Sequence, residues 1–362
     1  MDAVGRVAAV VRELAAGRVV LLTDQARGEA ALLASAGLVT PETLVFLIRN
    51  SEGIVSAPMR AERLDQLRIP PQLGGPSATS GRPGLPEPAV SVDLRKGVST
   101  GISARDRAAT LRALANPRTI APDLVRPGHV APIRCSAGGV LDHQRLMPGA
   151  LDLCVLAGCG PCAAVAELAE SADGRSAVEV AGRMAPAAGL VAVDVSDVAR
   201  HRRVSESHVG RGASTTLPTV HGEFQALGYD YDRDGSAQLV LYVGNIASDD
   251  VLVRVHAECI TGDALGSRRC RCAQALDASL QIIGQRGRGV VVYLRERGRA
   301  GVGMAHIVEG CGVRDERDET IAAHILRDLG VRSAILLTDR PDGPVGPTGF
   351  GLTVSRRIAV LG

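Results

Sequence analysis

The spacing of apolar residues predicts a helix at the start of the chain and a buried strand after it. Apolar residues recur every three or four positions between Val4 and Leu14, with charged residues between them. In our interpretation Gly17 ends this helix, and the run RVVLL at residues 18–22 is typical of a buried strand. The interspersed charges argue against a signal peptide, and no stretch reaches the apolar length of a membrane span. We therefore expect a cytoplasmic protein.

The rest of the first half has the pattern of an α+β domain. The polar segment TDQARGEA at residues 23–30 follows the strand, and GVSTGIS at residues 97–103 precedes a helix with apolar periodicity. Glycine and proline crowd residues 74–88, which we interpret as a loop. The order strand, polar turn and helix is typical of an α+β enzyme domain.

The second half alternates strands with helices, which predicts an α/β layered domain. Continuous or alternating apolar runs predict strands and helical spacing predicts helices, in the order strand 238–246, strand 249–259, helix 273–285, strand 289–294, helix 319–329 and strand 332–341. Residues 204–217 are polar, rich in Gly, Ser and Thr, and lack apolar periodicity. We expect a linker there, between domains at 1–203 and 218–362.

Composition narrows the possible functions. A chain of 362 residues can form two domains with separate cores. A net charge of +2, an aromatic content of 2% and the absence of Trp give no case for binding nucleic acid or a membrane. Eight cysteines without a secretory signal indicate reduced thiols or metal ligands.

Three of the cysteines have the spacing of a metal site. Cys270 and Cys272 form a Cys-x-Cys pair, and Cys259 precedes them across two glycine-containing turns. Three thiolates leave one tetrahedral position for water, which is typical of a catalytic zinc. A closed structural site, completed by His256 or Cys311, is the alternative.

The segment RVHAECITGD, followed by GSRRCRC, closely resembles the zinc-binding motif of GTP cyclohydrolase II. The resemblance implies a hydrolase that opens the imidazole ring of GTP and releases formate and pyrophosphate, with Mg²⁺ at the triphosphate and a homodimer as the assembly. It implies these roles: zinc ligands Cys259, Cys270 and Cys272; GTP contacts Arg254, His256, Glu258, Gly298, Arg299 and Thr338; a proton acceptor, Asp315; and a nucleophile toward the α-phosphorus, Arg317.

The chain departs from the GTP cyclohydrolase II pattern in its recognition segments. The segment between the glycine-rich loop and Asp315 is shorter than in that family and contains no Tyr. Ala275 stands where the family has Gln, and Arg297 replaces a Glu. Two alternatives to GTP turnover follow: a zinc-binding paralogue with a regulatory or partner-binding role, and a zinc hydrolase acting on another purine nucleotide.

The first half resembles 3,4-dihydroxy-2-butanone 4-phosphate synthase over residues 4–203. GVSTGISARDRAATL and RPGHVAPIR match the scaffold of that family. Of the chemical residues Arg27 and Glu167 are kept, but Gly28 and Leu146 stand where the family has a metal-binding Glu and His. Neither replacement offers a ligand to Mg²⁺. We expect a retained fold whose synthase activity is lost, and the residues leave open whether Glu29 and His143 rebuild a metal site.

Cys159 and Cys162 enclose Gly-Pro, a spacing also found in thioredoxin-type dithiols. The alternative is a pair of small residues between a helix at 150–157 and a strand at 163–168. The thioredoxin pattern of a preceding strand and a long following helix is missing, which favours the structural interpretation.

Overall fold

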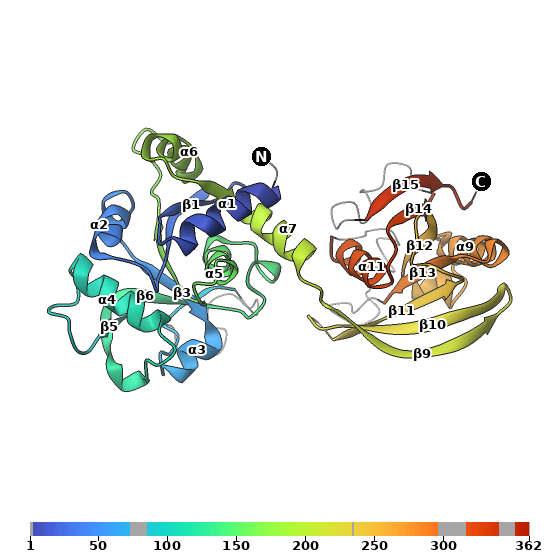
Figure 1. The fold of residues 1–362 in the computed structure, drawn as a ribbon, viewed down its shortest axis with the longest axis horizontal. Helices are drawn as coiled ribbons and strands as arrows, with labels where there is room; N and C mark the ends of the chain where they lie inside the picture. The colour runs from blue at the N-terminus through green and yellow to red at the C-terminus, as the bar shows by residue number, and fades with distance from the viewer. Residues whose placement is uncertain (1–2, 73–84, 234, 296–315, 340–351, 362) are drawn as a thin grey trace. The chain divides into compact units, whose positions relative to one another are not determined.

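The computed structural model describes residues 3–72, 85–233, 235–295, 316–339 and 352–361 (Figure 1). The chain divides by its contacts into two units, Met1–Arg202 and Arg203–Gly362. Each unit contains one sheet with helices packed against it, so the predicted two-domain organisation with mixed α and β structure is confirmed. No helix among the described residues is long and apolar enough to cross a membrane.

Unit 1 is built on an eight-stranded sheet of mixed direction. Seven strands follow the order β4-β6-β3-β7-β2-β1-β8, and β5 pairs with β6 outside this path. The strands are β1 Val20–Asp24, β2 Glu29–Ser35, β3 Ser56–Arg60, β4 Glu87–Pro88, β5 Val92–Leu94, β6 Leu124–Cys135, β7 Ala163–Glu167 and β8 Ala192–Asp194.

Helices cover both faces of this sheet, because its central strands are apolar on both sides. In the β1–β2 hairpin, Leu21 faces Leu32 in one core cluster and Val20 faces Leu33 in the other. The helices are α1 Ala3–Ala15, α2 Pro41–Arg49, α3 Ala61–Gln66, α4 Ala104–Ala115, α5 Leu146–Leu156, α6 Ala177–Ala188 and α7 Val195–Ser205. Helices α1, α5 and α7 contribute to the Val20 cluster, whereas α2, α3, α4 and α6 contribute to the Leu21 cluster.

Unit 2 contains a seven-stranded sheet in the order β15-β14-β12-β13-β11-β10-β9. Its strands are β9 Val209–Thr219, β10 Gly222–Tyr231, β11 Ser236–Val243, β12 Val251–Ala257, β13 Gly289–Leu294, β14 Ser333–Leu337 and β15 Thr353–Ile358. Strands β9, β10, β11 and β13 pair antiparallel, and β12 pairs parallel with β13 and β14. Helix α9, Cys272–Arg286, packs on one face, and α11, Glu316–Asp328, packs on the other.

The interval 204–217 is not the linker that we expected. Helix α7 continues to Ser205, and residues 209–217 belong to β9, which pairs along its length with β10. Strand β9 is exposed along almost all of its length and lies at the sheet edge, so it lacks the apolar alternation by which a strand is recognised.

Candidate metal centre and nucleotide site

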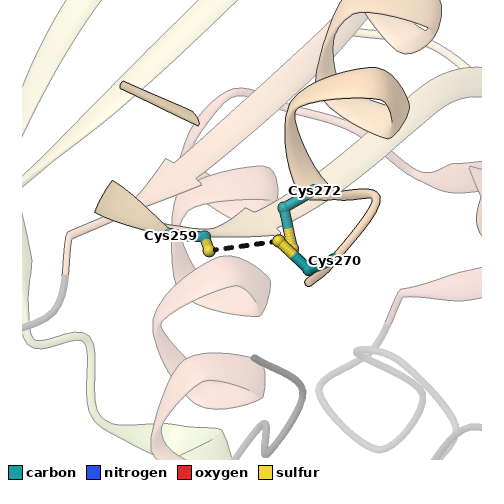
Figure 2. A group of neighbouring side chains, drawn as sticks. All are labelled: Cys259, Cys270 and Cys272. Atoms are coloured by element: carbon teal, nitrogen blue, oxygen red, sulfur yellow. Dashed lines mark hydrogen bonds between the residues drawn. The ribbon is translucent and has the colours of Figure 1, made fainter. Parts of the chain in front are cut away.

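Three cysteine side chains converge where β12 ends and α9 begins (Figure 2). Cys259 follows β12, Cys270 lies in the turn before α9, and Cys272 is the first residue of α9. Their Sγ atoms all lie within 4.8 Å of one another, and those of Cys259 and Cys270 are 3.7 Å apart. Tetrahedral zinc with Zn–S bonds of about 2.3 Å places its sulfurs about 3.8 Å apart. The three thiols therefore fit a zinc ion in number, chemistry and spacing.

Gly262 makes room for the sulfurs. It lies in the short helix α8, Ile260–Asp263, whose N-cap residue is Cys259. A Cβ atom on Gly262 would lie 2.7 Å from the Sγ of Cys270 and 3.1 Å from the Sγ of Cys259. Its amide also donates to the Sγ of Cys259 over 3.4 Å. The backbone at position 262 therefore lies so close to the thiols that only a residue without a Cβ atom fits there without a clash.

The carboxylate of Asp263 lies behind Cys259. Its Oδ2 accepts hydrogen bonds from the Cys259 amide at 2.9 Å and the Tyr293 hydroxyl at 2.9 Å, and lies 3.0 Å from Nε2 of His256. Burial acts to raise the pKa of Asp263, but these hydrogen bonds outweigh it and hold the pKa below its usual value. Burial and the bond to Asp263 raise the pKa of Tyr293. The lowered pKa of Asp263 favours the ionised carboxylate, which accepts these hydrogen bonds.

His256 does not complete a closed metal site. Its side chain is 2% exposed and its Nε2 faces Asp263. Among the described residues, the three cysteines form the one group of three or more potential ligands within mutual reach, and His256 is not part of it. Cys311, the other ligand that would close the site, lies outside the described residues.

Further predicted nucleotide contacts gather at the carboxyl ends of the parallel strands. Arg254, in β12, donates to the carbonyl of Leu337 at 2.9 Å, and Thr338 follows directly after β14. Glu258 extends the β12–β13 pairing through its amide, which donates to Leu294 O at 2.8 Å. Ligands of α/β sheets bind outside this edge. Arg254, in the middle of β12, thus reaches the end of β14, whereas Glu258 and Thr338 directly follow parallel strands, as Cys259 does after Glu258.

The remaining predicted site residues of unit 2 belong to the connection before α11 and to the first turn of that helix. Gly298, Arg299 and Asp315 lie outside the described residues, in the connection between β13 and α11. Arg317 lies in the first turn of α11, and its side chain is outside the described part. Strand β13, which precedes these residues in the chain, runs parallel to β12.

In unit 1, the kept residue Arg27 has hydrogen-bond partners, whereas the kept residue Glu167 lies near other carboxylates. Arg27 donates to the Asp24 carboxylate at 2.8 Å and to Gln144 O at 3.0 Å. Glu167 is the last residue of β7. Partial burial, followed by repulsion from the carboxylates of Glu29 and Glu52, raises its pKa. Glu29 therefore lies near another carboxylate.

The replaced positions of unit 1 have local structural roles. Gly28 lies in the turn of the β1–β2 hairpin with φ +72°, a backbone conformation that residues other than Gly rarely adopt. Leu146, at the position of the metal-binding His, is 4% exposed and packs in the core cluster with Met147. His143 precedes α5, and it forms no group with Glu29 among the potential ligand groups of the described residues.

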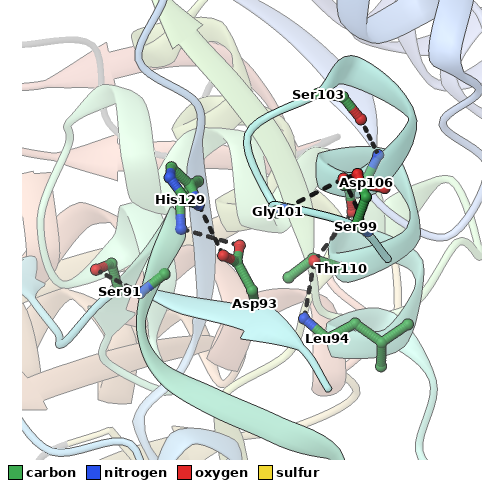
Figure 3. Close-up of polar contacts among 10 residues, drawn as sticks. Ser91, Asp93, Leu94, Ser99, Gly101, Ser103, Asp106, Thr110 and His129 are labelled. Atoms are coloured by element: carbon green, nitrogen blue, oxygen red, sulfur yellow. Dashed lines mark hydrogen bonds and ion pairs between the residues drawn. The ribbon is translucent and has the colours of Figure 1, made fainter. Parts of the chain in front are cut away.

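The structure also shows a polar pair, Asp93 and His129, of which His129 belongs to the scaffold segment RPGHVAPIR (Figure 3). The carboxylate of Asp93 lies 2.7 Å from Nδ1 of His129 and accepts from the His129 amide at 2.9 Å. Nearby, Asp106 accepts from the amides of Ser99 and Gly101, both at 3.2 Å, and so closes the GVSTGIS loop. A histidine in a β-strand was the available signal, but its partner lies 36 residues away.

The Cys159–Cys162 segment has the structural character that we favoured. Cys162 is buried, and burial raises its pKa to about 12, which disfavours the reactive thiolate. The Sγ of Cys159 lies 3.6 Å from both Leu14 O and Ala157 O. The segment connects α5 to β7, as predicted.

Comparisons with known proteins support the same division. Residues 8–201 match the family model of 3,4-dihydroxy-2-butanone 4-phosphate synthase, and residues 210–359 match that of GTP cyclohydrolase II. Riboflavin biosynthesis protein RibBA of Salinispora arenicola is 39% identical, with 99% of this chain and 89% of the relative covered. RibBA of Mycobacterium tuberculosis is 37% identical over the same shares.

A solved structure shows a likeness in fold over the same length of chain. The crystal structure of RibBX, a two domain 3,4-dihydroxy-2-butanone 4-phosphate synthase from A. baumannii, is 26% identical with a TM-score of 0.73 and covers 99% of both chains. The chain therefore belongs to the family of riboflavin biosynthesis proteins in which a 3,4-dihydroxy-2-butanone 4-phosphate synthase domain precedes a GTP cyclohydrolase II domain.

Proposed function

We propose that unit 2 is a zinc-dependent GTP cyclohydrolase II that opens the guanine imidazole ring of GTP and releases formate and pyrophosphate. The main support for this proposal is that Cys259, Cys270 and Cys272 converge beyond the carboxyl end of the parallel strand β12. This arrangement supports the proposal because α/β proteins bind nucleotides outside the carboxyl ends of their strands, and these thiols are the one such ligand group among the described residues.

Within this proposal the chain's own residues have separate tasks. The three thiolates would hold zinc, which when bound supplies Lewis acidity that makes water nucleophilic near neutral pH. Arg254, Glu258 and Thr338 would contact the nucleotide, because Glu258 and Thr338 directly follow parallel strands and the Arg254 guanidinium reaches the last residue of β14. His256 faces Asp263 and is buried, so we assign it to the support of the site rather than to contact with GTP.

We infer that Arg317 and the residues outside the described part keep the roles that the resemblance implies. We propose that Gly298 and Arg299 contact the phosphates, with Mg²⁺ at the triphosphate, that Asp315 accepts a proton and that Arg317 attacks the α-phosphorus. The order of the elements supports this, because these residues lie in the chain between β13 and the first turn of α11. We also propose that the protein is a homodimer and that it acts in the cytoplasm.

We further propose that unit 1 keeps the synthase fold without its metal-dependent activity. Gly28 and Leu146 stand at the two metal-ligand positions of the resemblance, and each has a local structural role, in a hairpin turn and in the core. Restoring a carboxylate at position 28 would require a non-glycine residue at positive φ. Single substitutions are therefore not expected to rebuild the metal site.

The test of the proposed function is a product analysis. Zinc-loaded protein is incubated with GTP and Mg²⁺, and the nucleotide is followed by mass spectrometry. Loss of formate together with pyrophosphate supports the proposal if Cys270→Ser and Arg317→Ala abolish it. A ring-opened product that still carries the formyl group would limit the activity to the first hydrolysis.

The second candidate is a zinc-binding paralogue with a regulatory or partner-binding role. It is favoured by the shortened segment before Asp315, which contains no Tyr, together with the altered positions of unit 1. Unchanged GTP in the presence of a folded, zinc-containing protein would select this candidate.

A further inference from the structure

Asp263 connects separate parts of the metal centre through one oxygen atom. Its Oδ2 lies within hydrogen-bonding distance of the Cys259 amide, of Nε2 of His256 and of the Tyr293 hydroxyl, at 2.9, 3.0 and 2.9 Å. His256 belongs to β12 and Tyr293 to β13. Cys259, which carries the first thiol, is the N-cap residue of α8 in the loop that follows β12. A single carboxylate therefore joins the cysteine loop to two neighbouring strands.

The bonds between Cys259 and Asp263 are reciprocal. The Asp263 carboxylate accepts from the Cys259 amide, and the Asp263 amide donates to the Cys259 carbonyl at 2.6 Å. Between them, the Gly262 amide points at the Cys259 sulfur. This closed turn leaves Cys259 little backbone freedom, so the direction of its thiol depends on the position of Asp263.

The sheet in turn fixes the carboxylate. His256 and Tyr293 are register partners in the parallel β12–β13 ladder, and their rings stack with centroids 5.3 Å apart at an interplanar angle of 20°. The two donors thus approach Asp263 from one rigid surface. Asp263 itself does not belong to the group of potential metal ligands, so its contribution is to geometry rather than to coordination.

Burial makes the arrangement sensitive to loss of any partner. The Asp263 side chain is 9% exposed, and its second oxygen, Oδ1, is buried without a hydrogen-bond partner among the described residues. A buried carboxylate is tolerated only where donors compensate it. The three donors on Oδ2 provide that compensation, and they hold the acceptor in one place.

We infer that Asp263 is a positioning residue that fixes the Cys259 thiol for metal binding. The inference rests on the proposed zinc centre. Groups that orient metal ligands from behind typically contribute about 10- to 100-fold to metal affinity or activity. Asp263 orients Cys259 through the backbone, and we expect its removal to lower zinc affinity within that range.

The test measures zinc affinity of the full chain by competition with a chromophoric chelator. Asp263→Ala removes the acceptor, Asp263→Asn keeps the shape without the charge, and Tyr293→Phe removes one donor while retaining the ring. Asp328→Asn is the matched control, because Asp328 accepts from the Tyr229 hydroxyl and from Arg211 in the same unit but belongs to α11 and not to the cysteine loop. Cobalt-substituted protein reports thiolate coordination through its absorption spectrum, independently of turnover.

We expect affinity to fall about 10- to 100-fold in Asp263→Ala and less in Asp263→Asn and Tyr293→Phe, with an altered cobalt spectrum in all three. Asp328→Asn should bind zinc as the parent does. Parent-like affinity and spectrum in both Asp263→Asn and Tyr293→Phe would overturn the inference, and this comparison does not depend on the folding of Asp263→Ala. A parent chain that binds zinc but leaves GTP unchanged would contradict the proposed function while leaving the zinc comparison decisive. A parent that binds no zinc would overturn both.

Discussion

Substituting Gly262 by Ala would perturb the cysteine cluster without removing a ligand. The added methyl carbon would lie 2.7 Å from the Sγ of Cys270, 3.1 Å from that of Cys259 and 3.4 Å from the Cβ of Cys272. A distance of 2.7 Å between a Cβ atom and a sulfur is shorter than non-bonded contacts in proteins, so at least one sulfur must move. Because the sulfurs are the proposed ligands, the displacement should act on metal binding first.

The magnitude follows from two opposing effects. Overpacking of a well-packed site costs about 1–3 kcal/mol. Ala in place of Gly within a helix stabilises the protein by up to roughly 1 kcal/mol, and this gain applies with and without metal. If the clash must be relieved only when the sulfurs are held at ligand positions, zinc affinity should fall about 5- to 150-fold, at a factor of ten for each 1.4 kcal/mol.

Two other helical glycines provide matched controls. A Cβ on Gly182 of α6 would meet no atom within 4 Å, so Gly182→Ala should leave zinc affinity unchanged and stability equal or higher. A Cβ on Gly284 of α9 would lie 2.3 Å from His221 O, so Gly284→Ala should lower stability through a clash away from the thiols. Zinc affinity is measured by chelator competition and stability by thermal unfolding in chelator. Parent-like zinc affinity of Gly262→Ala would refute the reasoning.

Three further predictions concern unit 1. Asp152→Ala should lower the free energy of unfolding by about 3–5 kcal/mol in denaturant titrations, because it removes the buried carboxylate 2.7 Å from Arg202; a loss below about 1 kcal/mol would contradict this. The Ser99 hydroxyl, followed by backbone donors, lowers the pKa of Asp106 below its unfolded value, so its stabilisation is present above about pH 4 and is lost as pH falls through the folded pKa. Unfolding titrations between pH 7 and pH 3 should therefore show a shallower pH dependence for Asp106→Asn, and an unchanged slope would exclude this role. Cys162, whose pKa burial raises to about 12, should resist iodoacetamide at pH 8 in the folded protein and react after denaturation, as read by peptide mass spectrometry; labelling of the folded form would contradict its burial.

Much of unit 2 could be predicted from apolar spacing. The strand expected at residues 289–294 has those bounds, and the helix expected at 273–285 is Cys272–Arg286. Both elements bury an apolar face or run, which is the property that periodicity detects. Strand β9 was missed because its side chains are exposed at a sheet edge, so its sequence carries no such pattern.

The candidate site was predictable as far as local spacing reaches. Cys270 and Cys272 are neighbours in sequence, and Cys259 joins them through one short helix. The support from Tyr293 was not predictable, because that residue lies on another strand and meets Asp263 only through the parallel β12–β13 pairing. The Asp93–His129 pair was missed for the same reason, since β5 and β6 bring its members together.

The central claim is that the thiol cluster supports ring opening of GTP, and labelled formate tests it most directly. GTP carrying ¹³C at C8 of the guanine is incubated with zinc-loaded protein and Mg²⁺, and the ¹³C NMR spectrum is followed with time. We expect a growing formate signal that disappears when zinc is removed and returns when zinc is restored. A folded protein that contains one zinc per chain and releases no labelled formate would contradict the account.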